Sequence, residues 1–151
     1  MYGGTNNLNS QWNTFNDLWK FDITTNNWTW ISGDTIPNQS PEYGVKGIPS
    51  VFNSPGARSE MVCTWVDSLN NLWLFGGASS NFKAYSDLWK YSIATNQWTW
   101  MKGDSTLDGV GYFGIKGVED SLNNPSARWV YSRWKDNDDN FWIFGGKRYN
   151  S

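Results

Sequence analysis

SDLWKYSIATNQWTW, residues 86–100, decides the fold of this chain, because NDLWKFDITTNNWTW has already occurred at residues 16–30. The offset between the two copies, 86 minus 16, is 70 residues. Apolar and polar side chains alternate in both copies, so that Trp19, Phe21 and Ile23 share one face of a β-strand. Turn-forming residues then precede a second aromatic run. Each copy therefore predicts a β-hairpin, and the chain is predicted to be a repeat protein.

Two further strands precede the second hairpin. Residues 57–66 predict a strand, a turn follows, and the apolar run 72–75 ends in a pair of glycines. The same order returns at 127–135 and 141–146. The unit is thus four short antiparallel strands in about 70 residues, which predicts an all-β chain.

The repeat divides the chain into three parts. Residues 57–102 hold one complete four-stranded unit. Residues 1–56 hold the end of a second strand, strands three and four, and a long loop over 33–56. Residues 103–151 hold an equivalent loop over 103–126 and the first two strands of a further unit. Both loops repeat their glycine and apolar positions, so we expect them to be ordered.

Glycine pairs, aromatic rings and arginines recur at fixed places in the repeat. They are the glycines at 3–4, 76–77 and 145–146, the Asp-Leu-Trp runs at 17–19 and 87–89, the ring pairs Phe21/Trp28 and Tyr91/Trp98, and Arg58 and Arg128 near the start of strand one. This pattern resembles the kelch repeat, the four-stranded blade of one class of β-propeller. The resemblance implies one complete kelch-type blade and two complementary half-blades. The repeat is longer than the roughly 50 residues of an ordinary kelch repeat, and the excess lies in the two long loops.

Two blades of strands are too few to close a propeller, which typically has about 4–8 blades. Either the chain is a piece of a longer propeller, or copies assemble by half-blade complementation. Three chains would then form a six-bladed ring and four chains an eight-bladed ring. A head-to-tail contact that does not close would give a filament, which we favour less.

Aromatic residues are unusually frequent, with 12 Trp, 8 Phe and 7 Tyr. So many rings predict a packed core or a buried interface. The expected core tryptophans are Trp19, Trp28, Trp73, Trp89, Trp98 and Trp142. We expect Trp30, Trp65, Trp100 and Trp134 to face a neighbouring blade or a subunit interface.

The net charge argues against two classes of partner. At -2 it does not favour nucleic acid or an anionic membrane.

The sequence does not determine the cellular compartment, because no transmembrane run and no secretion signal is visible. Cys63 is the single cysteine, so no internal disulfide is possible. Asn27 and Asn38 match the glycosylation pattern, for which chance is the simpler interpretation in a chain this rich in Asn.

The chain contains no histidine, which excludes Ser-His-Asp and Cys-His catalysis within it. The run 136–140 resembles the start of an EF-hand loop, but it lacks the glycine at position six and has Lys147 where a bidentate Glu belongs. A solvated turn is the simpler interpretation. We predict no catalytic residue, no metal site and no cofactor.

The long connections 5–15, 33–56, 78–85 and 103–126 are predicted to leave from one end of the sheets, opposite the tight turns. Binding sites are usually carried by such loops on a rigid scaffold. The candidate partner-binding residues at this loop-rich end are Trp12, Phe15, Tyr43, Lys46, Arg58, Phe82, Tyr85, Tyr112, Phe113, Lys116 and Arg128. Trp12, Phe15, Phe82 and Tyr85 differ in spacing between the copies, which favours them for a partner-specific surface.

For the candidate residues that recur in both copies of the repeat, a structural role is the alternative to partner binding. Tyr43 and Phe113 would pin the long loops against the body of the protein. Arg58 and Arg128 would either line a central channel or, more simply, bond to a backbone carbonyl or to an aspartate such as Asp17 or Asp87.

These features favour a non-catalytic binding or scaffolding module that presents its loop-rich end to a protein. A carbohydrate-binding propeller, or part of a larger carbohydrate-active protein, is the first alternative, because exposed aromatic rings stack on sugars. A structural subunit of an extracellular ring or fibre is the second.

Overall fold

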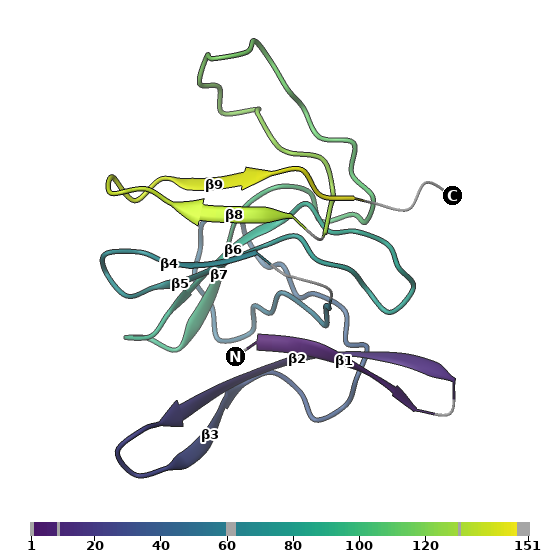
Figure 1. The fold of residues 1–151 in the computed structure, drawn as a ribbon, viewed down its shortest axis with the longest axis vertical. Coiled ribbons are helices and arrows are strands. Elements are labelled where there is room, and N and C mark those ends of the chain that lie inside the picture. Colours follow the sequence, from purple (N-terminus) through teal and green to yellow (C-terminus); the bar gives the residue numbers. More distant parts are fainter. Residues whose placement is uncertain (1, 9, 60–62, 130, 148–151) are drawn as a thin grey trace.

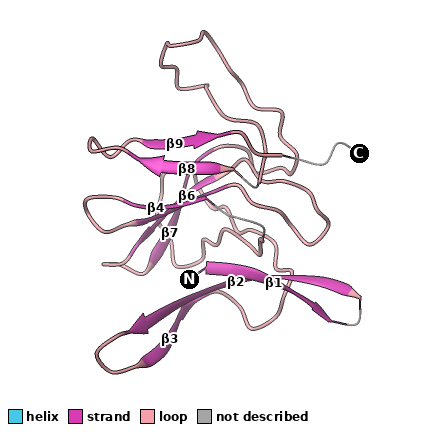
Figure 2. Ribbon diagram, viewed as in Figure 1, coloured by secondary structure: helices cyan, strands magenta, loops and turns pink. Residues whose placement is uncertain are grey.

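The computed structural model describes residues 2–8, 10–59, 63–129 and 131–147. These residues form nine strands in three antiparallel sheets and no helix (Figures 1 and 2), so the predicted all-β fold is confirmed. The described part of the chain accordingly contains no apolar helix of membrane-spanning length.

The first sheet has the order β1-β2-β3, with β1 (Tyr2–Leu8), β2 (Gln11–Asp22) and β3 (Asn27–Ser32). Its β1–β2 ribbon stands where the sequence predicts a loop over 5–15, and that prediction is wrong. The cause is a buried face made of polar side chains, Thr14 and Asn16, each 2% exposed. Asn38 Oδ1 accepts from Thr14 N at 2.8 Å, and Asn16 Nδ2 donates to Asp34 Oδ2 at 2.7 Å. Hydrogen bonds thus replace the apolar contacts that a hydropathy pattern detects.

The second sheet contains, in order, β4 (Cys63–Val66), β5 (Leu72–Phe75), β6 (Leu88–Ser92) and β7 (Gln97–Lys102), and the third contains β8 (Ser132–Lys135) and β9 (Phe141–Phe144). β4 and β8 begin later than the strands predicted from residues 57 and 127. Before them single bridges extend the pairing of the same two segments, at Ser59 with Ala78 beyond β5 and at Trp129 with Lys147 beyond β9. Residues 60–62 and 130 of the predicted strands lie outside the described residues.

The hairpins β2–β3 and β6–β7 are the same structure built twice. Trp19 lies opposite Trp30 in the first hairpin, and Trp89 lies opposite Trp100 in the second. A register shift precedes the first tryptophan of each pair, between Leu18 and Trp19 and at the equivalent place in β6. The two hairpins therefore present the same backbone pairing to any surface that packs on them.

The tight turns and the longer connections lie on different sides of the molecule. In Figure 1 the turns β2–β3, β4–β5, β6–β7 and β8–β9 point to the left, and we call this side the turn end. The tip of the β1–β2 ribbon and the 78–85 connection extend to the right, at the loop-rich end.

The principal core cluster lies on the middle sheet and is shared between units. Leu74, Trp89, Tyr91 and Trp98 of the middle sheet form it together with Leu18 of the first sheet, and Tyr43 of the 33–56 loop packs against it. The loop of one unit therefore covers the sheet of the next.

This cover divides the predicted core tryptophans into two groups. Trp89 and Trp98 are 0% and 3% exposed, whereas Trp19, Trp28 and Trp142 are 36%, 54% and 49% exposed. The prediction that these last three belong to the core is wrong in this structure. Within the described residues no loop equivalent to 33–56 lies over Trp19 and Trp28. Trp142 is the counterpart of Trp73, the sixth predicted core tryptophan, which is half-buried and packs against Phe141 of the third sheet.

The turn between β8 and β9 makes a prediction for pH dependence. Asp136 accepts hydrogen bonds from Trp142 Nε1 at 2.8 Å, from Asn140 N at 2.9 Å and from Asp138 N at 3.0 Å. These bonds, that of Trp142 foremost, lower the pKa of Asp136 from 3.8 to about 2. A depressed folded-state pKa stabilises the turn above pH 3.8, and the contribution is lost as the pH falls toward 2.

We expect an NMR titration of the carboxyl carbons to give Asp136 a midpoint near 2. Trp142→Phe removes the largest cause and should move that midpoint toward 3.8. Asp139 is the control, because Lys135 and Ser68 lower its pKa to about 2 without Trp142. A wild-type midpoint near 3.8 for Asp136 would contradict this description of the turn.

Candidate functional site

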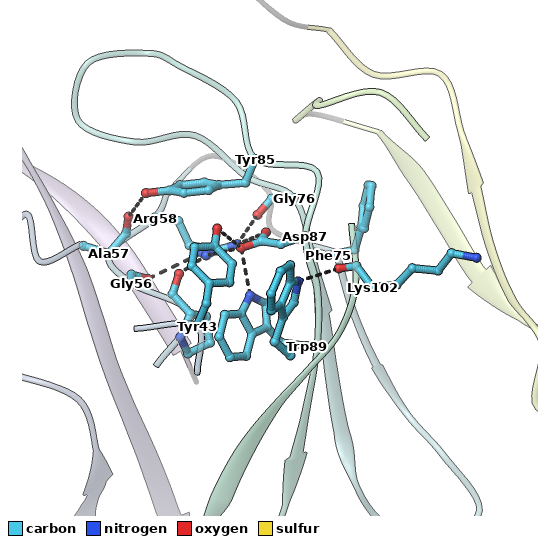
Figure 3. Close-up of polar contacts among 12 residues, drawn as sticks. Tyr43, Gly56, Ala57, Arg58, Phe75, Gly76, Tyr85, Asp87, Trp89 and Lys102 are labelled. Atoms are coloured by element: carbon cyan, nitrogen blue, oxygen red, sulfur yellow. Dashed lines mark hydrogen bonds and ion pairs between the residues drawn. The ribbon is translucent and has the colours of Figure 1, made fainter. Parts of the chain in front are cut away.

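A buried ion pair within the 57–102 unit lies where the 33–56 loop meets the middle sheet. Arg58, just after the loop, and Asp87, just before β6, are both fully buried. The guanidinium donates to both carboxylate oxygens, Nη1 to Oδ1 at 2.7 Å and Nη2 to Oδ2 at 3.0 Å (Figure 3). Arg58 Nη1 also donates to Gly76 O at 3.0 Å, and Nη2 donates to Pro55 O. This bidentate geometry is the strong form of the pair.

Further donors saturate the Asp87 carboxylate. Asp87 Oδ2 accepts from Tyr43 Oη at 2.9 Å and from Trp89 Nε1 at 2.8 Å (Figure 3). The carboxylate is thus surrounded by donors and buried with all of them in place, as a buried charge requires.

The protonation states follow from this arrangement. Burial alone would lower the pKa of Arg58, but the charge and hydrogen bonds of Asp87 outweigh burial and raise it above its ordinary value. Burial raises the pKa of the Tyr43 hydroxyl, and the nearby Asp87 charge raises it further. Arg58 therefore stays charged and Tyr43 stays protonated, as their roles as donors require.

Aromatic rings enclose the pair on the loop side. The Tyr43 ring stacks on Trp89 with centroids 5.3 Å apart and meets Trp100 edge-on at 4.8 Å. Lys46 Nζ lies 4.2 Å from the centre of the Trp100 ring, at cation–π distance. Arg58 Cζ lies 4.0 Å from the centre of the Tyr85 ring. Four of the predicted site residues, Tyr43, Lys46, Arg58 and Tyr85, thus meet in one cluster.

These four residues make contacts within the protein, and of the four only Lys46 is exposed. Arg58 and Tyr85 are 0% and 5% exposed. The sequence left two roles open for Arg58, lining a channel or bonding within the protein. The structure shows the second role, with bonds to backbone carbonyls and to Asp87. Tyr43 pins the long loop, as its alternative role requires, and Lys46 Nζ donates to Gly103 O at 3.0 Å.

No protein-family model matches this sequence, and no curated protein matches it. Function is therefore inferred from the geometry of the molecule itself.

A second pair of predicted residues meets at the loop-rich end. Trp12 lies at the tip of the β1–β2 ribbon and Phe82 in the 78–85 connection. Their rings make an edge contact with centroids 6.1 Å apart, and they stay 42% and 39% exposed. Phe15, the fourth of the unrepeated candidates beside the buried Tyr85, is half-buried.

The remaining candidates belong to the 103–126 loop and the third sheet. Tyr112 and Phe113 are 53% and 71% exposed, and Lys116 is exposed. Arg128 is half-buried and donates to Gly145 O, to Ser126 O and to Ser126 Oγ. These four residues lie outside the Arg58 cluster. Three of them, Phe113, Lys116 and Arg128, nevertheless follow Tyr43, Lys46 and Arg58 at the constant offset of 70 residues.

Sequence reasoning missed one residue of the cluster. Asn53 is 6% exposed, and its Nδ2 donates to Ile48 O and to Trp98 O at 3.0 Å each, which ties the loop to β7. The available signal was the recurrence of asparagine 70 residues later, at Asn123.

Proposed function

We propose that this protein is a non-catalytic binding and scaffolding module of kelch-type propeller blades, which presents its loop-rich end to a protein partner. The Trp12–Phe82 pair is the observation that carries the proposal. Aromatic side chains are typical anchors of protein interfaces, and these two come from different units and stay exposed together.

The backbone at Phe82 supports this proposal. Phe82 has a φ of 58°, an uncommon value for a bulky side chain. A short loop holds it there, because Phe82 N donates to Ser79 O at 3.0 Å and Ser79 N donates to Lys83 O at 2.9 Å. Backbone strain that is maintained at an exposed aromatic residue is typical of binding sites.

The saturated Arg58–Asp87 pair supports the scaffolding half of the proposal. Its donors and acceptors are satisfied by the chain itself, and the hydrogen bond from Tyr43 to Asp87 fixes the 33–56 loop on the 57–102 unit. Binding residues usually lie on loops that a rigid scaffold positions, and here the stacked units position the exposed aromatic pair.

Panning of a random peptide library on the immobilised protein tests the proposal. We expect enriched peptides to bind the wild type and to lose at least about 10-fold in affinity on Trp12→Ala and on Phe82→Ala. Leu69→Ala is the matched control, since Leu69 is 80% exposed but lies at the turn end. No enrichment, or equal binding to Phe82→Ala and Leu69→Ala, would contradict the proposal. Binding on a glycan array without peptide binding would favour carbohydrate recognition instead.

A further inference from the structure

The contact between the 33–56 loop and the middle sheet, which we call the internal joint, has two sides. The loop side consists of Tyr43, Lys46, Asn53 and Arg58, and the sheet side of Asp87, Trp89, Trp98 and Trp100 (Figure 3 shows its centre). Backbone bonds complete it, because Gly47 N donates to Trp100 O at 2.8 Å and Ser50 N to Trp98 O at 3.2 Å.

The loop side occurs a second time in the chain, 70 residues later. Its members there are Phe113, Lys116, Asn123 and Arg128. Arg128 is already placed as Arg58 is: Nη1 donates to Gly145 O at 3.0 Å, as Arg58 Nη1 does to Gly76 O. Within the described residues no carboxylate pairs with Arg128. Arg128 therefore has the backbone bond of Arg58 without the counter-charge that Arg58 has.

The rest of the second loop is also formed in advance. Asn123 Nδ2 donates to Val118 O at 3.1 Å, the counterpart of the Asn53 bond to Ile48 O. The bridge between Tyr112 and Asn124 repeats the bridge between Glu42 and Ser54. The second loop therefore has the internal contacts of the first, while Phe113 remains 71% exposed.

The sheet side also occurs a second time, 70 residues earlier. Its members there are Asp17, Trp19, Trp28 and Trp30. Trp19 Nε1 donates to Asp17 Oδ2 at 2.6 Å, as Trp89 Nε1 does to Asp87. Trp30 Nε1 donates to Ser32 O, as Trp100 Nε1 does to Lys102 O. Trp28 and Trp30 are 54% and 46% exposed, and β3 is the outer strand of its sheet.

We infer that a second copy of this chain docks its 112–128 segment on the β2–β3 hairpin of the first copy. Arg128 of one copy then forms a buried ion pair with Asp17 of the other, and Phe113 packs on Trp19 and Trp30. In Figure 1 the 103–126 loop extends to the top and the β2–β3 hairpin lies at the bottom, with the middle sheet between them, so one molecule cannot join its own two sides. The interface is heterologous and adds copies head to tail.

A second copy fits because the two surfaces match in charge, in exposed aromatic rings and in backbone register. The arginine meets an aspartate, the exposed Phe113 meets exposed tryptophans, and Gly117 N and Asp120 N meet the open edge of β3. One difference makes this joint weaker than the internal one. Phe113 has no hydroxyl, so Asp17 receives one hydrogen bond fewer than Asp87 does. The inference goes beyond the proposed function, since it uses neither Trp12 nor Phe82.

Sedimentation of the whole chain over a range of concentrations tests the inference. We expect the wild type to associate and each charge reversal, Asp17→Arg or Arg128→Asp, to weaken association by more than about 100-fold, because a buried charge loses its partner. An equimolar mixture of the two variants should regain association, since the introduced aspartate of one variant then meets the introduced arginine of the other across the interface. The matched reversals Lys83→Asp and Asp138→Arg, at exposed positions outside the joint, should change nothing.

A third variant keeps the test decisive if a charge reversal disturbs folding. Phe113→Asp changes an exposed loop residue, so we expect an unaltered circular dichroism spectrum together with lost association. A wild type that stays monomeric at every concentration overturns the inference. Association that survives Phe113→Asp, or folded reversal variants whose mixture stays monomeric, overturns it as well.

Discussion

Asp87→Ala is expected to lower the free energy of unfolding by about 3–5 kcal/mol, a large fraction of the stability of a typical domain. The substitution leaves the Arg58 guanidinium fully buried without its counter-charge. It also removes the acceptor of the Tyr43 hydroxyl and of the Trp89 indole. Urea denaturation followed by tryptophan fluorescence measures the change.

Asp17→Ala is the matched control for this prediction. Asp17 holds the same place in the first unit, but within the described residues it forms no ion pair. We expect its substitution to cost at most about 1 kcal/mol in the monomer. The double variant Arg58→Ala with Asp87→Ala should lose less than the sum of the single variants, since neither charge is then left alone. Equal losses for Asp87→Ala and Asp17→Ala would contradict the role of the buried pair.

Trp89→Ala is expected to cost about 3–5 kcal/mol, because the fully buried ring leaves a large cavity in the core. Trp19→Ala removes the same side chain from the equivalent position, where the ring is 36% exposed. We expect a clearly smaller loss there, and thermal unfolding followed by far-ultraviolet circular dichroism compares the two.

The comparison is informative because the local sequence is the same around both tryptophans. Each is followed two residues later by an aromatic ring and lies opposite another tryptophan. The Tyr43 ring stacks on Trp89 and helps to bury it. Similar losses for the two variants would show that the loop adds little to the burial of Trp89.

Most of the strand pattern could be predicted from the sequence, because it depends on local periodicity. The alternation around Trp19 and Trp89 gave the hairpins, and the constant offset gave the repeat. The β1–β2 ribbon could not be predicted, since its buried face consists of Thr14 and Asn16, whose partners lie far along the chain. A hydropathy pattern does not detect a buried strand face that consists of polar side chains.

The candidate site shows a different limit. The sequence identified Tyr43 and Arg58 but left two roles open for each, because their partner Asp87 is 29 residues or more away. It treated Trp19 and Trp89 alike, because the repeat is the same at both. Exposure depends on which unit lies above each ring, and that is a property of the assembled units rather than of the local sequence.

Hydrogen exchange of individual backbone amides tests most directly that the loop of one unit is fixed on the sheet of the next. The measurement compares Gly47 and Ser50, which donate to Trp100 O and Trp98 O, with their counterparts Gly117 and Asp120. In the Asp17→Arg variant, which we expect to be monomeric, exchange at Gly47 and Ser50 should be at least about 100-fold slower than at Gly117 and Asp120. Equal exchange at the two pairs would contradict the account.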